Sequence, residues 1–81
     1  MDVHFSERAF VLINVRPDAV DSVYAKLREN SNIAMVDIVY GPYDIIALIV
    51  ANDKKKITNI VLYDIRNLDG VVETLTCIKA D

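Results

Sequence analysis

Seven consecutive apolar residues, Ile45 to Ala51, constrain this chain more than any other feature of its sequence. A strand with apolar side chains on both faces must be covered on both sides of its sheet. In a chain of 81 residues, helices can supply one of these covers. A second copy of the chain is the simplest source of the other cover. The sequence therefore predicts a sheet protein that associates with itself.

The composition also favours self-association. Hydrophobic residues make up 53% of the chain, although a domain of this length buries only about 60–65% of its unfolded surface. The apolar excess fits an interface between copies, and a very dry core is the alternative. The length predicts one domain over residues 1–81.

Charge and residue counts exclude several classes of function. A net charge of -3 argues against direct nucleic-acid binding, and the basic run Lys54–Lys56 is too short to follow a phosphate backbone. With one cysteine and one histidine, we expect no disulfide, no metal site and no cofactor, and we interpret Cys77 as a small core residue. No apolar run reaches the ~18 residues of a membrane span, so a soluble, cytoplasmic protein is expected.

Hydrophobic periodicity predicts four strands and two helices. The strands are expected at Ala9–Val15, Ile33–Tyr40, Ile45–Ala51 and Val71–Lys79. One helix should carry the apolar stripe Val20, Val23, Tyr24 and Leu27, and the other the stripe Ile57, Ile60, Val61, Ile65 and Leu68.

The expected ends of the helices have recognisable residues. Asp18 is the predicted N-cap of the first helix, and Asn52-Asp53 the predicted cap of the second. Gly70 should end the second helix in a left-handed conformation. The resulting order, strand–helix–strand–strand–helix–strand, predicts an α+β ferredoxin-like fold. In this fold a four-stranded antiparallel sheet carries both helices on one face, and the first and third strands are central. The other face of the sheet has no helices to cover it, and its apolar residues predict a dimer joined through this face.

Catalytic machinery is not evident in the sequence. Nucleophilic catalysis needs a nucleophile with a base in reach, and phosphate binding needs a glycine-rich loop. Gly41 and Gly70 are the only glycines, and Cys77 has no pairing histidine in the pattern. We therefore predict that the protein is not an enzyme.

The turn before the apolar strand can form a small-molecule site. Backbone amides at Gly41 can receive a carboxylate, Asp44 can receive an ammonium group, and Tyr40 and Tyr43 offer apolar walls with polar tips. An ordinary tight hairpin is the alternative.

The last strand carries two aligned hydroxyl groups. Thr74 and Thr76 lie on one face of this strand and can bond the polar end of a ligand. Ordinary β-branched residues on an edge strand are the alternative.

These features together resemble the effector-binding (RAM) domain of the Lrp/AsnC, or feast/famine, transcription regulators. The resemblance lies in the element order, the Gly41-Pro42-Tyr43-Asp44 turn, and Gly70-Val71 followed by Thr74-x-Thr76, and it spans nearly the whole chain. It implies a homodimer joined through the sheet face and higher rings, often octamers, with an amino acid bound between dimers. The implied ligand-binding residues are Tyr40, Gly41, Tyr43, Asp44, Thr74 and Thr76.

Family members carry a helix-turn-helix before this domain, whereas this chain begins a few residues before its first strand. It therefore resembles a stand-alone form that would modulate transcription by assembling with full-length Lrp/AsnC regulators. Ile60 and Val61 on the second helix favour a branched apolar effector. Two alternatives stay open: a purely structural oligomerisation partner without effector binding, and a small ferredoxin-like enzyme of the monooxygenase type.

Overall fold

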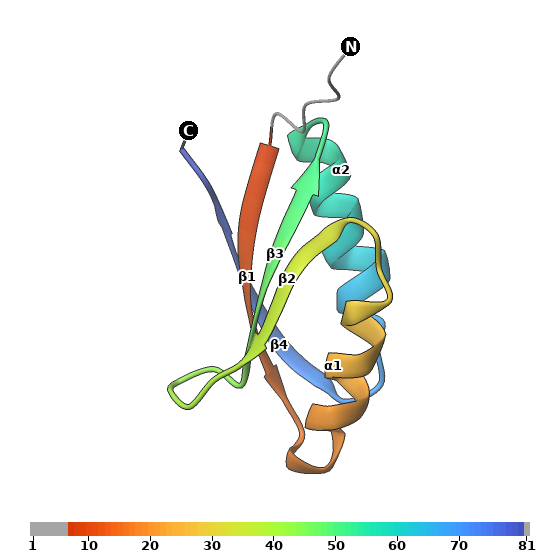
Figure 1. Cartoon of the computed structure of the whole chain (residues 1–81), viewed down its shortest axis with the longest axis vertical. Coiled ribbons are helices and arrows are strands. Elements are labelled where there is room, and N and C mark those ends of the chain that lie inside the picture. Colours follow the sequence, from red (N-terminus) through yellow and green to blue (C-terminus); the bar gives the residue numbers. More distant parts are fainter. Residues whose placement is uncertain (1–6, 81) are drawn as a thin grey trace.

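The computed structural model describes residues 7–80, in which four strands form one sheet with the helices packed on one side (Figure 1). The strands are β1 (Glu7–Val15), β2 (Ile33–Ile38), β3 (Ile45–Ala51) and β4 (Val71–Ile78). The helical segments are the 3-10 turn η1 (Pro17–Ala19), α1 (Val20–Arg28), α2 (Lys54–Asn59) and the π-helical turn η2 (Ile60–Ile65).

The sheet has the order β2-β3-β1-β4, and its neighbouring strands are antiparallel. The two most apolar strands, β1 and β3, are therefore central, as the sequence predicts. The order of elements and the placement of both helices on one face confirm the ferredoxin-like α+β fold.

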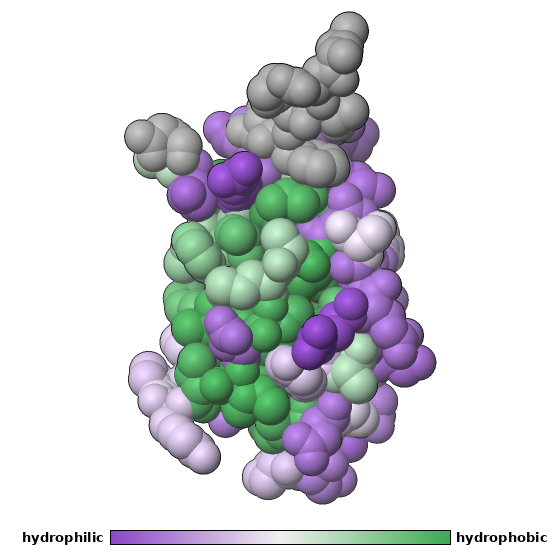
Figure 2. Space-filling model, viewed as in Figure 1, coloured by the Kyte–Doolittle hydropathy of each residue, from purple (hydrophilic) through white to green (hydrophobic). Residues whose placement is uncertain are grey.

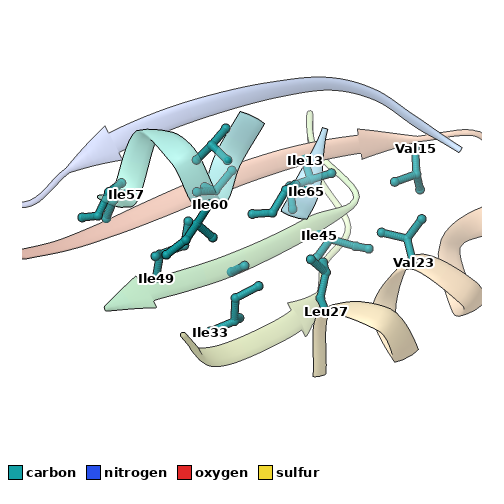
Figure 3. Packing of buried hydrophobic residues seen from close by; sticks show 14 of the residues in the cluster. Ile13, Val15, Val23, Leu27, Ile33, Ile45, Ile49, Ile57, Ile60 and Ile65 are labelled. Atoms are coloured by element: carbon teal, nitrogen blue, oxygen red, sulfur yellow. The ribbon is translucent and has the colours of Figure 1, made fainter. Parts of the chain in front are cut away.

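The core lies between the sheet and the helices (Figure 3). Alternate residues of the central strands point into it, and Ile13, Ile45 and Ile49 have no exposed surface. From the helical side, Leu27 and Ile57 complete the packing with 1% and 0% of their surface exposed. Within the described residues, every buried side chain is apolar, so this layer contains no buried ionisable group.

Two strands end earlier than predicted. β2 stops at Ile38, two residues before Tyr40, because the chain turns there and the Val39 N–H donates to the Asp44 carbonyl at 2.9 Å. β4 ends at Ile78, one residue before the predicted end, whereas β3 has the predicted bounds.

The prediction that Asp18 caps the first helix is wrong. Asp18 lies inside η1, its carboxylate accepts a hydrogen bond from Arg16 Nε at 3.1 Å, and no side chain caps α1. The helical turn begins one residue before Asp18, so Asp18 stands within its first turn and not at the cap position. The cap of the second helix is confirmed, since the Asp53 carboxylate accepts from the Lys56 N–H at 2.7 Å.

Gly70 has the predicted left-handed backbone, with φ +99°, although helix η2 ends five residues before it, at Ile65. A Cβ atom at Gly70 would overlap with the Ala19 side chain. The Gly70 carbonyl accepts a hydrogen bond from the Arg16 N–H at 2.8 Å, so the loop before β4 is held against the end of β1. Glycine is required here by both backbone conformation and packing.

The face of the sheet away from the helices also carries apolar residues, and no element formed by residues 7–80 covers it. In the central strands, Phe10, Leu12 and Leu48 on this open face keep part of their surface exposed, and Leu75 in β4 is 47% exposed. Figure 2 shows hydrophobic residues gathered over the strands, whereas the helical side is largely hydrophilic. Cys77 pairs with Phe10 on the open face and is exposed, so its predicted place in the core is wrong.

Candidate functional site

The loop between β2 and β3 is anchored by one residue, Asp44. Its N–H donates to the Ile13 carbonyl at 3.0 Å, and its carboxylate Oδ2 accepts from the Val15 N–H at 2.9 Å. Asp44 therefore fixes the base of the loop to the end of β1. One carboxylate oxygen is used for this purpose, so ligand binding would depend mainly on the other.

The tip of the loop has few contacts with the rest of the chain. Tyr40 is fully exposed, with a relative exposure of 105%, and no heavy atom lies within 4 Å of the place where a Cβ would stand on Gly41. Tyr43 is partly buried. Figure 1 shows that the loop projects beyond the sheet, away from the helices. Its phenol and backbone groups are thus available to a molecule outside this subunit.

The two threonines of β4 lie on the helical side of the sheet. Thr74 pairs with Ile13 and Thr76 with Val11, and both partners point into the core. Beside the threonines is a groove of about 340 Å³ between β4 and the second helical segment. It is lined by Thr74, Thr76 and Ile78 from β4 and by Thr58, Val61, Leu62 and Arg66 opposite.

The six predicted ligand-binding residues thus form two groups. Tyr40, Gly41, Tyr43 and Asp44 belong to the loop, and Thr74 and Thr76 belong to the groove. The loop projects away from the helices, whereas the groove adjoins them, and no loop residue is among the described residues that line the groove. Asp44 and Thr74 both adjoin Ile13 of β1, from opposite sides, whereas the tip of the loop extends away from the groove.

Arg66 is a groove residue that the sequence analysis missed. Its N–H bonds to the Val61 carbonyl at 2.8 Å, which closes a turn between residues five apart. Residues five apart on an α-helix are separated by about 140° around the axis. A turn closed by an i→i+5 bond returns the chain closer to its starting side. The helical period used for the prediction therefore could not place Arg66 beside Val61.

Two exposed ionisable groups have shifted pKa values, and neither belongs to the loop or lines the groove. Hydrogen bonding to Arg16 lowers the pKa of the exposed Asp69 carboxyl, and Asp69 and Asp18 in turn raise the pKa of Arg16. Their contacts, 3.2 Å from Arg16 to Asp69 and 3.1 Å to Asp18, connect the end of β1 to the loop before β4. This cluster has a structural role, and its pKa shifts do not mark a catalytic centre.

The described residues offer neither a metal site nor a membrane-spanning helix. No group of three or more potential ligands in residues 7–80 could hold a metal ion. The helices in the same residues are all too short or too polar to cross a membrane.

The protein thus combines a four-stranded antiparallel sheet and two helices with a projecting loop and a threonine-lined groove. A family model described as the Lrp/AsnC ligand binding domain matches residues 8–79. The chain belongs to this family. It is accordingly a ligand-binding domain of transcription regulators and not an enzyme.

Solved structures have the same fold. TTHA0845 from Thermus thermophilus is 33% identical with a TM-score of 0.89, and the match covers 93% of this chain and 94% of that one. The AsnC protein of E. coli has the same TM-score at 18% identity, with 100% of this chain and 58% of that one covered. The regulator NMB0573 of Neisseria meningitidis, solved in complex with L-Met, has a TM-score of 0.87 at 18% identity, covering 95% of this chain and 51% of that one.

The last two identities support only the shared fold. No curated protein matches the chain.

Proposed function

We propose that residues 1–81 form a single amino-acid-sensing and oligomerisation domain that acts in the cytoplasm and modulates transcription by assembling with DNA-binding relatives. One observation carries this proposal. The loop and the groove bear the two halves of the implied ligand site, yet the tip of the loop projects away from the helices, one of which forms a wall of the groove (Figure 1). Binding that requires both halves would favour the assembled state over the separate subunits, and so would couple the effector to assembly.

The open sheet face supports a dimer as the first level of assembly. Phe10, Leu12 and Leu48 occupy the centre of this face and remain partly exposed in one subunit. Burying them against a second copy would remove apolar surface from water at about 25 cal/mol per Å². Dimers would then associate into a larger ring, such as an octamer, in which loops and grooves of different dimers meet.

Recognition of the effector follows from the chemistry of the two halves. The unbonded oxygen of Asp44 would accept an ammonium group, backbone amides near Gly41 would approach polar atoms, and the hydroxyls of Thr74 and Thr76 would complete the polar contacts. Tyr40 and Tyr43 would cover the ligand. The apolar groove wall, with Val61 and Leu62, favours a small aliphatic or branched amino acid. The L-Met complex of NMB0573 shows one amino acid bound to a protein with the same fold.

A structural oligomerisation partner without effector binding is the second candidate. The bond from the Val15 N–H to the Asp44 carboxylate favours it, because this bond gives the aspartate a role in the fold alone. The two candidates differ in whether an amino acid changes the size of the assembly.

Titration calorimetry with the common amino acids, combined with sedimentation, tests the proposal. At least one amino acid should release or absorb heat and shift the distribution of assemblies. Asp44→Asn should abolish this heat, because it removes the negative charge but keeps an oxygen that can accept from Val15. Asp21→Asn, on the exposed first turn of α1, is the matched control and should bind as the wild type does. An oligomer that responds to no amino acid would support the structural candidate instead.

A further inference from the structure

The groove beside β4 contains a positive charge that has no partner among residues 7–80. Within residues 7–80, no ion pair or side-chain hydrogen bond involves the Arg66 guanidinium. The described residues that line the groove include no carboxylate. A guanidinium always carries its charge and offers donors in a fork that matches a carboxylate. The groove therefore presents an unmatched cation beside a concave surface.

The rest of the groove has the chemistry of an aliphatic pocket with a polar end. Val61, Leu62 and Ile78 supply apolar surface, and the hydroxyls of Thr74 and Thr76 lie on the strand opposite Arg66. The Thr58 hydroxyl already donates to the Lys54 carbonyl at 3.2 Å and so is not a free donor. A volume of about 340 Å³ is at the small end of the range of ligand pockets. It suits a molecule of a few carbon atoms.

The backbone geometry explains why the cation is there. In η2 the bond from the Arg66 N–H to the Val61 carbonyl widens the helix by one residue and brings Arg66 toward the side of Val61. Val61 is 7% exposed and belongs to the core, so this side faces the sheet. Wide turns of this kind are rare and occur frequently at functional sites.

We infer that this groove binds the carboxylate of a short aliphatic acid, with Arg66 as its anchor and Thr74 and Thr76 as further donors. The inference rests on the proposed function and deepens it: the effector's carboxylate would lie in the groove of one subunit while its ammonium group lies against Asp44 of another. Ammonium recognition is then separate from carboxylate recognition. An aliphatic acid without an amino group should still enter the groove, with lower affinity than the amino acid.

The test uses 4-methylpentanoate, which has the carbon skeleton of leucine without its ammonium group. Calorimetry at millimolar concentration should detect binding to the wild-type protein. Arg66→Gln should weaken binding about tenfold to a hundredfold, the range for loss of a charge-assisted hydrogen bond. The affinity of Arg66→Lys for 4-methylpentanoate should lie between those of the wild type and Arg66→Gln, because lysine keeps the positive charge but lacks the forked pair of donors.

Two controls keep the result specific. Arg28→Gln makes the same change on α1, where the guanidinium lies over the Tyr24 ring, and should leave 4-methylpentanoate binding unchanged. Leucinamide has no carboxylate, so its binding should be the same in the wild type and in Arg66→Gln. Circular dichroism should show the wild-type fold in Arg66→Gln, because the guanidinium makes no contact that the fold needs.

The outcomes separate this inference from the proposed function. If 4-methylpentanoate does not bind, or binds Arg66→Gln as tightly as the wild type, the groove is not a carboxylate site. Leucine binding that depends on Asp44 but not on Arg66 would overturn the inference and leave the amino-acid sensor standing. A third outcome would overturn the amino-acid sensor and leave the carboxylate site standing. In it, 4-methylpentanoate binding depends on Arg66, leucine binds no more tightly than 4-methylpentanoate, and Asp44→Asn changes neither affinity.

Discussion

Ile45 and Ile46 are consecutive isoleucines of β3 in different surroundings. Ile45 points toward the helices and has no exposed surface, whereas Ile46 points to the open face and stays partly exposed. The same contrast runs along β1, where Ile13 is buried and Leu12 is not. The chain's own packing thus accounts for only one of the two faces of these strands. Residues of the first kind hold the fold, and those of the second kind are available to partners.

The largest expected effect comes from the pair of isoleucines itself. Ile45→Ala should lower the free energy of unfolding by about 2–5 kcal/mol, because it leaves a cavity in the core. Ile46→Ala should lower the free energy of unfolding, measured at low protein concentration, by only about 1 kcal/mol. Its main effect should be weaker self-association. Urea unfolding and sedimentation over a range of protein concentrations measure both. Equal losses of stability, with no change in assembly, would mean that the two faces do not differ in this way.

The two glycines lie in loops that differ in the same way: Gly70 is packed against the core, and Gly41 is exposed. Gly70→Ala should destabilise by at least about 1–3 kcal/mol through backbone strain, with the overlap against Ala19 in addition. Gly41→Ala should stay within about 0.5 kcal/mol, because that position is exposed and open. Thermal unfolding of both variants checks the difference. A similar loss at both positions would show that the β2–β3 loop is held as tightly as the loop before β4.

A smaller effect on stability is expected at the tip of the loop. Tyr40→Ser should leave the free energy of unfolding within about 0.5 kcal/mol of the wild type, since the side chain is fully exposed. Its effect should appear instead in amino-acid binding or in assembly size. Calorimetry and light scattering on the same preparation test this, and a variant unchanged in all three measurements would remove Tyr40 from the proposed site.

The smallest effect concerns the Arg16–Asp69 pair. The pKa of Asp69 is lowered in the folded protein, so the pair stabilises the fold above the ordinary pKa of aspartate, about 3.9. This contribution is lost as the pH falls through the lowered pKa. Asp69→Asn should therefore narrow the difference in stability between neutral and acid pH slightly, and added salt should reduce the change further. Unfolding curves across pH, with and without salt, provide the measurement. A large effect that survives salt would contradict a solvent-exposed pair.

The fold could be predicted because its pattern is local and consistent. The apolar run Ile45–Ala51 and the Asp53 cap occur as expected, since each is determined by neighbours in the sequence. The prediction for Asp18 fails because a 3-10 turn already begins at Pro17, which places Asp18 inside the turn. The position of Cys77 depends on which face of an edge strand the helices leave bare.

The candidate site was less predictable than the fold. A regular helical period places Arg66 away from Val61, and only the wide turn η2 brings it into the groove. The position of the loop tip relative to the groove depends on the direction in which the loop projects, which no residue pattern encodes. The sequence therefore indicated the polar groups of the site without their arrangement.

The strand order has a consequence for biosynthesis. Residues 9 and 78 are partners in neighbouring strands, so β1 acquires its second neighbour only after β4 has been synthesised. The β2–β3 hairpin can close early, because its strands adjoin in sequence. Until β4 has been made, the apolar strand β1 lacks one of its two neighbouring strands. Such late closure of distant segments is slow and leaves nascent chains prone to mispairing.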